Sequence, residues 1–265
     1  MGATQMGYHD DDDKLDEVSV EAYESWRDQC EAFLNKLEET FPEDDAGRFE
    51  GWNLNGKTTF LVLVDTLKSN IRMVESKTYL VQMCTLSAPQ IDLPQVLEKN
   101  KFEDVNDLKN FKKRLEAIPR YIKQHCDLLE LGLEQNITQS RVVLANIPSQ
   151  IEAMLSADKN PYGNLLEENW KKTGASAELR DEVAAVIDDK VLPAFKEFAE
   201  FMEEFCPKLS EETAMPKRMA NGEEMYKFLV GYHTTTDMTP QEVHEVGLKE
   251  VARITDTMRE IAEKE

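Results

Sequence analysis

Residues 51–58 carry the most specific chemical pattern in this sequence. They match the phosphate-binding loop G-x-x-x-x-G-K-[ST] letter for letter, with Lys57 as the phosphate-binding lysine and Thr58 as the magnesium ligand. Such a loop must follow a buried β-strand, and the acidic, polar residues 38–50 cannot form one. The context therefore predicts a surface loop that caps the following helix. We consider three functional interpretations of this sequence, and a phosphate-loop nucleotide hydrolase ranks last among them.

His244 and Glu245 begin like the zinc-binding helix motif H-E-x-x-H, in which two histidines lie one turn apart. Leu248 occupies the position of the second histidine, so the ligand pair is missing. The other histidines are scattered along the chain: His9, His125 and His233. The sequence therefore predicts no catalytic residue, no metal ligand and no cofactor in this chain.

Charge and cysteine usage restrict the partners and the compartment. The formal net charge is −21, which repels both phosphate backbones and anionic membrane surfaces. No apolar run is long enough to span a membrane. The cysteines lie at long, irregular spacings without a C-x-x-C pair, which favours buried free thiols over disulfides: Cys30, Cys84, Cys126 and Cys206. We expect a cytoplasmic chain without nucleic-acid or membrane partners, unless a signal was removed or replaced.

Apolar residues recur at three- and four-residue steps along most of the chain, and we find no strand pattern long enough for a sheet. This periodicity predicts an all-α fold, an irregular multi-helix bundle with long kinked helices. Pro193 should kink the long helix over 179–205, whereas residues 87–94 should form a turn. Thr239-Pro240-Gln241-Glu242 is a capping box with proline at the first helical position, and it predicts a helix from 240 to the end.

Composition divides the chain into three parts. Residues 1–15 are predicted to be a disordered acidic tail or a tag-like segment, because residues 7–14 are similar to an epitope tag. Residues 16–160 are expected to form an N-terminal helical subdomain. Residues 161–265 are expected to form a C-terminal long-helix subdomain packed on it, with the boundary in the polar residues 157–176. The last helix lacks a stop signal, which suggests a truncated form, a short isoform or a cleaved precursor.

Three segments near the C-terminus carry a resemblance to a known family: residues 221–226, 232–248 and 250–254. They closely resemble the family called domain of unknown function 885, and earlier segments agree more loosely: 89–94, 114–119 and 138–143. The resemblance implies a helical fold related to gluzincin-type zinc peptidases. Their zinc helix, a His-Glu-x-x-x-Gly-His-His type run, lies downstream of the part seen here, and this chain has no such run.

The resemblance leaves two functional predictions open. In the first, the chain is a non-catalytic helical fragment or short form that acts as a binding or structural module. In the second, it is the N-terminal part of an active zinc metallopeptidase, completed by a downstream or second chain. Zinc is expected only with that missing part. Partners would be a second chain, the C-terminal half of the same family, or a peptide.

One segment is predicted to contact substrate, namely the link before the capped C-terminal helix, with Tyr232, His233, Thr234 and Thr235. Helix N-termini offer unpaired amides and the positive end of a dipole. Hydroxyl groups beside such an end could hold a peptide carboxylate or carbonyl in a peptidase-like protein. The alternative is structural, with these hydroxyls satisfying their own backbone.

Overall fold

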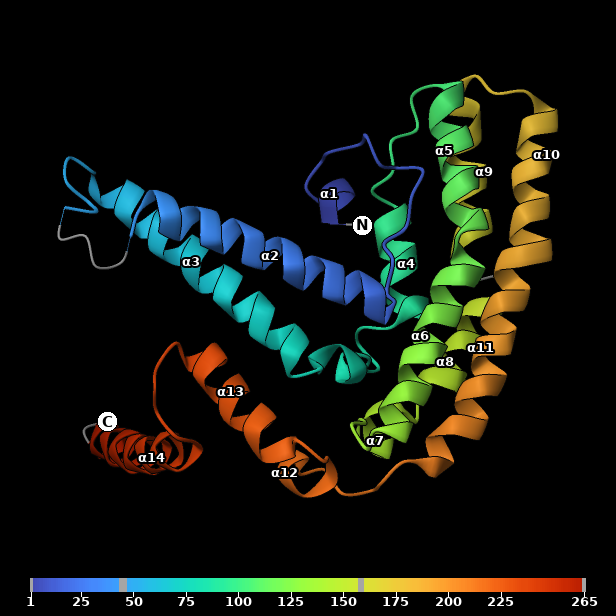
Figure 1. Ribbon diagram of the computed structural model, residues 1–265. Coiled ribbons are helices and arrows are strands. Elements are labelled where there is room, and N and C mark those ends of the chain that lie inside the picture. Colours follow the sequence, from blue (N-terminus) through green and yellow to red (C-terminus); the bar gives the residue numbers. More distant parts are fainter. Residues whose placement is uncertain (1, 43–46, 157–159, 264–265) are drawn as a thin grey trace. The chain divides into compact units, whose positions relative to one another are not determined.

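The computed structural model describes residues 2–42, 47–156 and 160–263 (Figure 1). Helices make up 73% of it and no sheet is present in the described part, so the prediction of an all-α multi-helix bundle is confirmed. The chain divides into two compact units, Met1–Thr213 and Ala214–Glu265. We describe each unit by itself.

Two long antiparallel helices form a hairpin in the first unit (Figure 1). They are α2 (Val20–Thr40) and α3 (Leu54–Glu75). Asn53 caps α3, because its side chain accepts a 2.8 Å hydrogen bond from the amide of Gly56. The phosphate-loop look-alike therefore caps a helix, as predicted, and the element before it is α2 rather than a strand.

The core of the first unit lies among shorter helices. The helix α11 (Leu192–Phe205) packs against both α6 (Ile118–Glu134) and α8 (Ile147–Leu155). Its inward face is fully or almost fully buried, which matches the predicted apolar stripe. Between α3 and α8 the chain also forms α4 (Pro89–Leu97), α5 (Val105–Glu116) and α7 (Arg141–Leu144).

Residues 87–94 are not a simple turn. Pro89 begins α4, where a missing amide hydrogen costs nothing, and the helix continues through Pro94. A two-residue bridge between Cys84 and Ser87 precedes it. The turn prediction failed because Pro89 was treated as a helix breaker, although the first helical position tolerates proline.

Pro193 is predicted to kink the long helix over 179–205, and the structure has a π turn just before this residue. Residues Ile187–Val191 are π-helical and join α10 (Ala177–Val186) to α11. Proline removes one amide donor, and its ring crowds the carbonyl of the preceding turn, so a locally wider helix relieves both problems. The stripe that crosses this point therefore stays continuous along the two helices.

The polar stretch at 157–176 does not separate two units. Its described part contains α9 (Pro161–Asn169), capped by the side chain of Asn160, and a 3₁₀ turn at Trp170–Thr173. Residues 157–159 lie outside the described residues. The division between compact units falls after Thr213, whereas we expected it at residue 160, because α9 packs on α10 within the first unit.

The N-terminal segment differs from the expected disordered tail. Within residues 1–15 a short helix α1 (Gly2–Gln5) is followed by a run of turns, and Thr4 and Asp12 are buried. Asp12 accepts a 2.7 Å hydrogen bond from Thr4 and lies 3.7 Å from the guanidinium of Arg114. The acidic residues 10–13 are held in place because the buried guanidinium of Arg114 requires hydrogen-bond acceptors.

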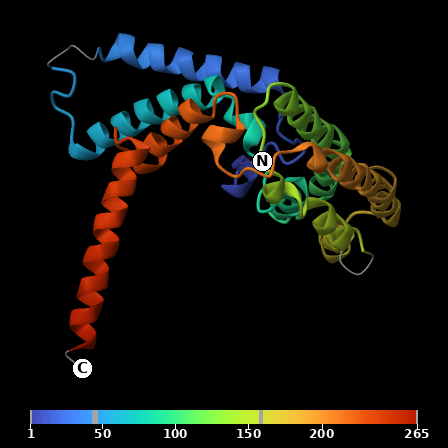
Figure 2. The same ribbon diagram turned by 90° about the horizontal axis from the view of Figure 1, so that it is seen from below.

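The second unit consists of α12 (Met215–Arg218), α13 (Gly222–Thr234) and α14 (Pro240–Ala262). Gly222 permits α12 and α13 to meet closely, because an added Cβ would lie 2.1 Å from the carbonyl oxygen of Met215. The predicted capping box at the start of α14 is present. Figure 2 shows α14 extending away from α13 as one long helix.

Candidate functional site

The residues predicted to contact substrate lie at the end of α13. Tyr232, His233 and Thr234 form its last turn, and Thr235 ends it with a left-handed backbone, at φ 54°. The two rings meet edge to face with their centroids 5.1 Å apart. The structure thus brings Tyr232 and His233 together on an exposed surface.

The threonine hydroxyls of this link donate to nearby backbone. Thr234 Oγ1 lies 2.8 Å from the carbonyl oxygen of Val230, and Thr235 Oγ1 lies 2.7 Å from the carbonyl oxygen of Thr234. Thr236 accepts a 3.3 Å bond from the amide of Met238. These contacts are those of the structural alternative, although each oxygen keeps lone pairs for a further partner. The binding role stays a prediction.

The N-terminus of α14 is engaged by its own cap. Glu242 accepts a 2.8 Å hydrogen bond from the amide of Thr239, whose hydroxyl accepts in turn from the amide of Glu242. These bonds from Thr239 lower the pKa of Glu242, so the carboxylate stays charged. A ligand at this end would therefore meet one negative side chain beside the helix amides.

No group of three or more His, Cys, Asp or Glu side chains in the described part of the chain is arranged to hold a metal ion. His125, in α6, packs against the edge of Tyr121 at 4.7 Å between ring centroids. Burial lowers the pKa of His125 to about 4, so its ring is neutral at pH 7. His125 is half-buried, and burial alone accounts for the direction of its pKa.

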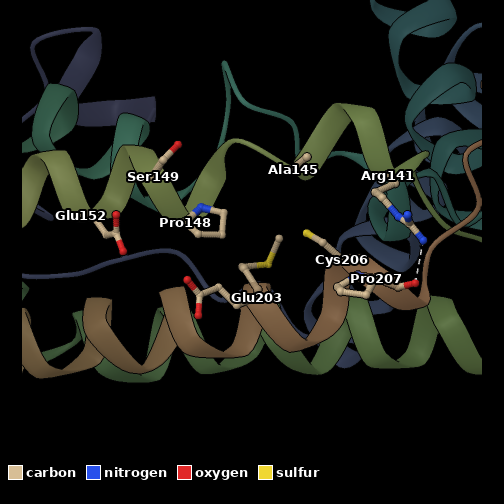
Figure 3. A pocket seen from close by; sticks show the side chains of 9 residues that line it. Arg141, Ala145, Pro148, Ser149, Glu152, Glu203, Cys206 and Pro207 are labelled. Atoms are coloured by element: carbon tan, nitrogen blue, oxygen red, sulfur yellow. Dashed lines mark hydrogen bonds between the residues drawn. The ribbon is translucent and has the colours of Figure 1, made fainter.

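An open groove of about 370 Å³ runs between α7–α8 and the end of α11 (Figure 3). Arg141 lies at one end and donates a 2.8 Å hydrogen bond to the carbonyl oxygen of Pro207, while Glu152 and Glu203 lie further along. Burial raises the pKa of the Cys206 thiol, so this sulfur is protonated and not an activated nucleophile.

Sequence reasoning missed this groove because its walls come from residues about 60 positions apart in the chain. Arg141 also bridges the exposed carboxylate of Glu211 at 2.8 Å. Its guanidinium therefore joins α7 to the segment after α11. The groove combines a structural cation with two carboxylates and offers no catalytic arrangement.

These features define an all-α protein in whose described residues no group of His, Cys, Asp or Glu is assembled to hold a metal ion. The chain belongs to the family described as "Bacterial protein of unknown function (DUF885)", which it matches over residues 1–265. The match includes residues 1–15. No curated protein sequence matches this chain significantly.

A solved structure from Colwellia psychrerythraea, of a candidate lipoprotein, has the same fold with a TM-score of 0.81 and 18% sequence identity. The match covers 98% of this chain and 47% of that chain. This chain therefore spans about half the length of that protein. Within the described residues, the helices are too short or too polar to cross a bilayer.

Proposed function

We propose that this chain is a non-catalytic helical module of a zinc-peptidase-like protein, acting as a binding or structural part of it. The observation that carries the proposal is the match of nearly the whole chain to about half of a longer protein with the same fold. The zinc-peptidase relation rests on the resemblance of residues 221–226, 232–248 and 250–254 to the family. In this proposal the zinc ligands lie in the other half.

The second candidate is the N-terminal part of an active zinc metallopeptidase, completed by a downstream or second chain. In both candidates the link at Tyr232, His233, Thr234 and Thr235 contacts a peptide substrate. The exposed pair of rings supports this role, since an aromatic face beside a hydrogen-bond donor is a common peptide contact. The charge of −21 supports a peptide or protein partner rather than nucleic acid.

The cytoplasm is the proposed compartment. All four cysteines are free, and a reducing compartment keeps thiols in this state. The C. psychrerythraea protein is a candidate lipoprotein, so an exported relative of this chain is the competing proposal. Cell fractionation with an antibody against the chain separates the two.

A chimera tests the proposed function. It consists of the C. psychrerythraea protein with its matched 47% replaced by this chain. We expect the chimera to hold about one zinc per molecule by elemental analysis and to cleave peptides, and this chain alone to do neither. A chimera that folds without zinc and without activity would contradict the peptidase relation. Tightly held zinc in this chain alone would contradict its non-catalytic role.

A further inference from the structure

Within the described residues of its own compact unit, no helix covers α14. It is 23 residues long and has no buried residue. Large apolar side chains along it are between 46% and 65% exposed: Val246, Leu248, Val251, Ile254, Met258 and Ile261. In a globular protein, a helix owes most of its stability to the packing of such a face. This helix therefore has a face that requires a partner.

The apolar face is too wide for a simple two-helix contact. At 3.6 residues per turn, the uncharged side chains form an arc of roughly 200° that runs from Val246 past Ile254 to Leu248. Only Glu250 and His244 interrupt it with ionisable groups. A coiled-coil seam is narrower and carries charges at its flanking positions. This arc is typical of a helix enclosed by several neighbours.

Two threonines inside the arc have hydroxyls that are already hydrogen-bonded within the helix. The hydroxyl of Thr255 donates to the carbonyl oxygen of Val251 at 2.7 Å, and that of Thr257 donates to the carbonyl oxygen of Arg253 at 3.0 Å. Because both hydroxyls are satisfied within the helix, their burial would leave no unpaired donor. The charged pair of Arg259 with Asp256 lies on the other side of the helix, whereas the pair of Arg253 with Glu250 reaches into the arc through Glu250.

Gly247, inside the same arc, is a second and independent sign. Glycine in a helix interior lowers stability relative to alanine, and here nothing in the described structure requires it. An added Cβ at Gly247 would meet no atom within 4 Å, whereas one at Gly132 would lie 2.7 Å from a backbone oxygen. A helix that approaches α14 closely at Gly247 would explain the residue.

We infer that the arc of α14 is the surface on which the remaining half of the family fold packs. The inference rests on the proposed function and deepens it, because it assigns the contact between this chain and the part proposed to hold zinc. The occupant is a multi-helix body rather than one helix, as the width of the arc requires. The C. psychrerythraea protein contains such additional chain, since 47% of it suffices to match this one.

Hydrogen–deuterium exchange of this chain and of the chimera tests the inference. We expect the amides of residues 247–261 to exchange at least about tenfold more slowly in the chimera, because their helix is then buried. Equal exchange rates of these amides in the two proteins would overturn the inference. Amide exchange depends neither on zinc nor on peptidase activity, so its result is independent of the test of the proposed function.

Charge substitutions locate the contact. Ile254→Glu should lower the melting temperature of the chimera by about 5 °C or more and leave that of this chain unchanged. Ala252→Glu adds the same charge on the opposite side of the helix and should change neither protein. Equal effects of the two substitutions in the chimera would contradict the assigned face. If this chain alone forms a dimer that Ile254→Glu dissociates, a second copy is the occupant and the inference is wrong.

Discussion

The guanidinium of Arg114, near the end of α5, donates a 2.7 Å hydrogen bond from Nε to the carbonyl oxygen of Lys14, 100 residues earlier in the chain. The same side chain donates to Asn100 at 2.6 Å and to the hydroxyl of Thr4 at 2.9 Å. Arg114 is fully buried. One arginine thus attaches the N-terminal segment to the helical core.

Arg114→Met should destabilise the protein strongly. The substitution keeps the volume of the side chain, but it removes the donor to Asn100 and to the carbonyl oxygens of Asp11 and Lys14. It also removes the buried cation that lies 3.7 Å from the carboxylate of Asp12. Loss of one member of such a buried network costs about 3–5 kcal/mol, which for a chain of this size lowers the melting temperature by roughly 6–15 °C. Thermal unfolding followed by circular dichroism measures it.

Arg120→Met is the matched control, because Arg120 lies one helix further along and forms an exposed pair with Glu17. Exposed ion pairs contribute about 0–1 kcal/mol, so this variant should melt within 2–3 °C of the parent. Similar losses in both variants would mean that Arg114 does not hold the N-terminal segment.

The Arg114 contact could not be predicted from the sequence, whereas the helices could. Helix starts such as Thr239-Pro240 carry local signals, because capping depends on residues within one turn. The acceptors of Arg114 lie at positions 4, 11, 14 and 100, and no local pattern relates them. An isolated acidic run is typical of a solvated tail, so only the tertiary structure shows that its backbone caps a buried cation.

The candidate site, too, could be predicted from the sequence only in part. The link between α13 and α14 was predicted because a hydroxyl-rich segment before a capping box is visible in the sequence. The direction of each hydroxyl could not be predicted, since the left-handed turn at Thr235 decides it. The groove beside Arg141 was missed because it arises only where α7 and α8 face α11.

Asn53→Ala and Lys57→Ala test the loop at 51–58. If the loop is a helix cap, Asn53→Ala loses the bond to Gly56 and about 1 kcal/mol of unfolding free energy. Lys57→Ala should change stability little, because its ammonium lies 5.9 Å from the Phe49 ring in an exposed cation–π contact. Urea unfolding measures both, and calorimetry with Mg-ATP should show no binding to the parent. Nucleotide binding that Lys57→Ala abolishes would revive the hydrolase interpretation.

His125 should make the protein sensitive to mild acid. Its pKa is about 4 in the folded chain and 6.5 when exposed, so between these values the unfolded state binds more protons. The contribution of His125 to the free energy of unfolding is complete above pH 6.5. It decreases as the pH falls toward 4 and changes no further below pH 4. The full loss is up to about 3 kcal/mol.

The substitution His125→Phe keeps a ring against Tyr121 but cannot bind a proton. Urea unfolding at several pH values should show a flatter profile between pH 4 and 6.5 for this variant than for the parent. His233→Phe is the control, because His233 is exposed and should leave the profile unchanged. A parent profile that His125→Phe does not flatten would mean that other groups cause the acid sensitivity.

Replacing Thr234 and Thr235 together by valine separates the two roles of the α13–α14 link. Valine keeps the shape of threonine and removes the hydroxyls that donate to Val230 and Thr234. In the chimera, the proposed substrate contact predicts a KM raised about tenfold or more, as expected when a hydrogen bond to substrate is lost. Peptide hydrolysis measured over a range of substrate concentrations gives KM and kcat separately.

Thr66→Val is the control for the loss of a helical back-bond, because the hydroxyl of Thr66 also donates to a carbonyl four residues earlier, that of Val62 at 2.7 Å, and lies outside both the link and the arc of α14. We expect this control to leave KM unchanged, since such a bond contributes little to helix stability. The structural account makes the opposite forecast for the double variant, namely a lower melting temperature with an unchanged KM. Full activity with full substrate affinity in the double variant would contradict the role of the link in peptide binding through the Thr234 and Thr235 hydroxyls.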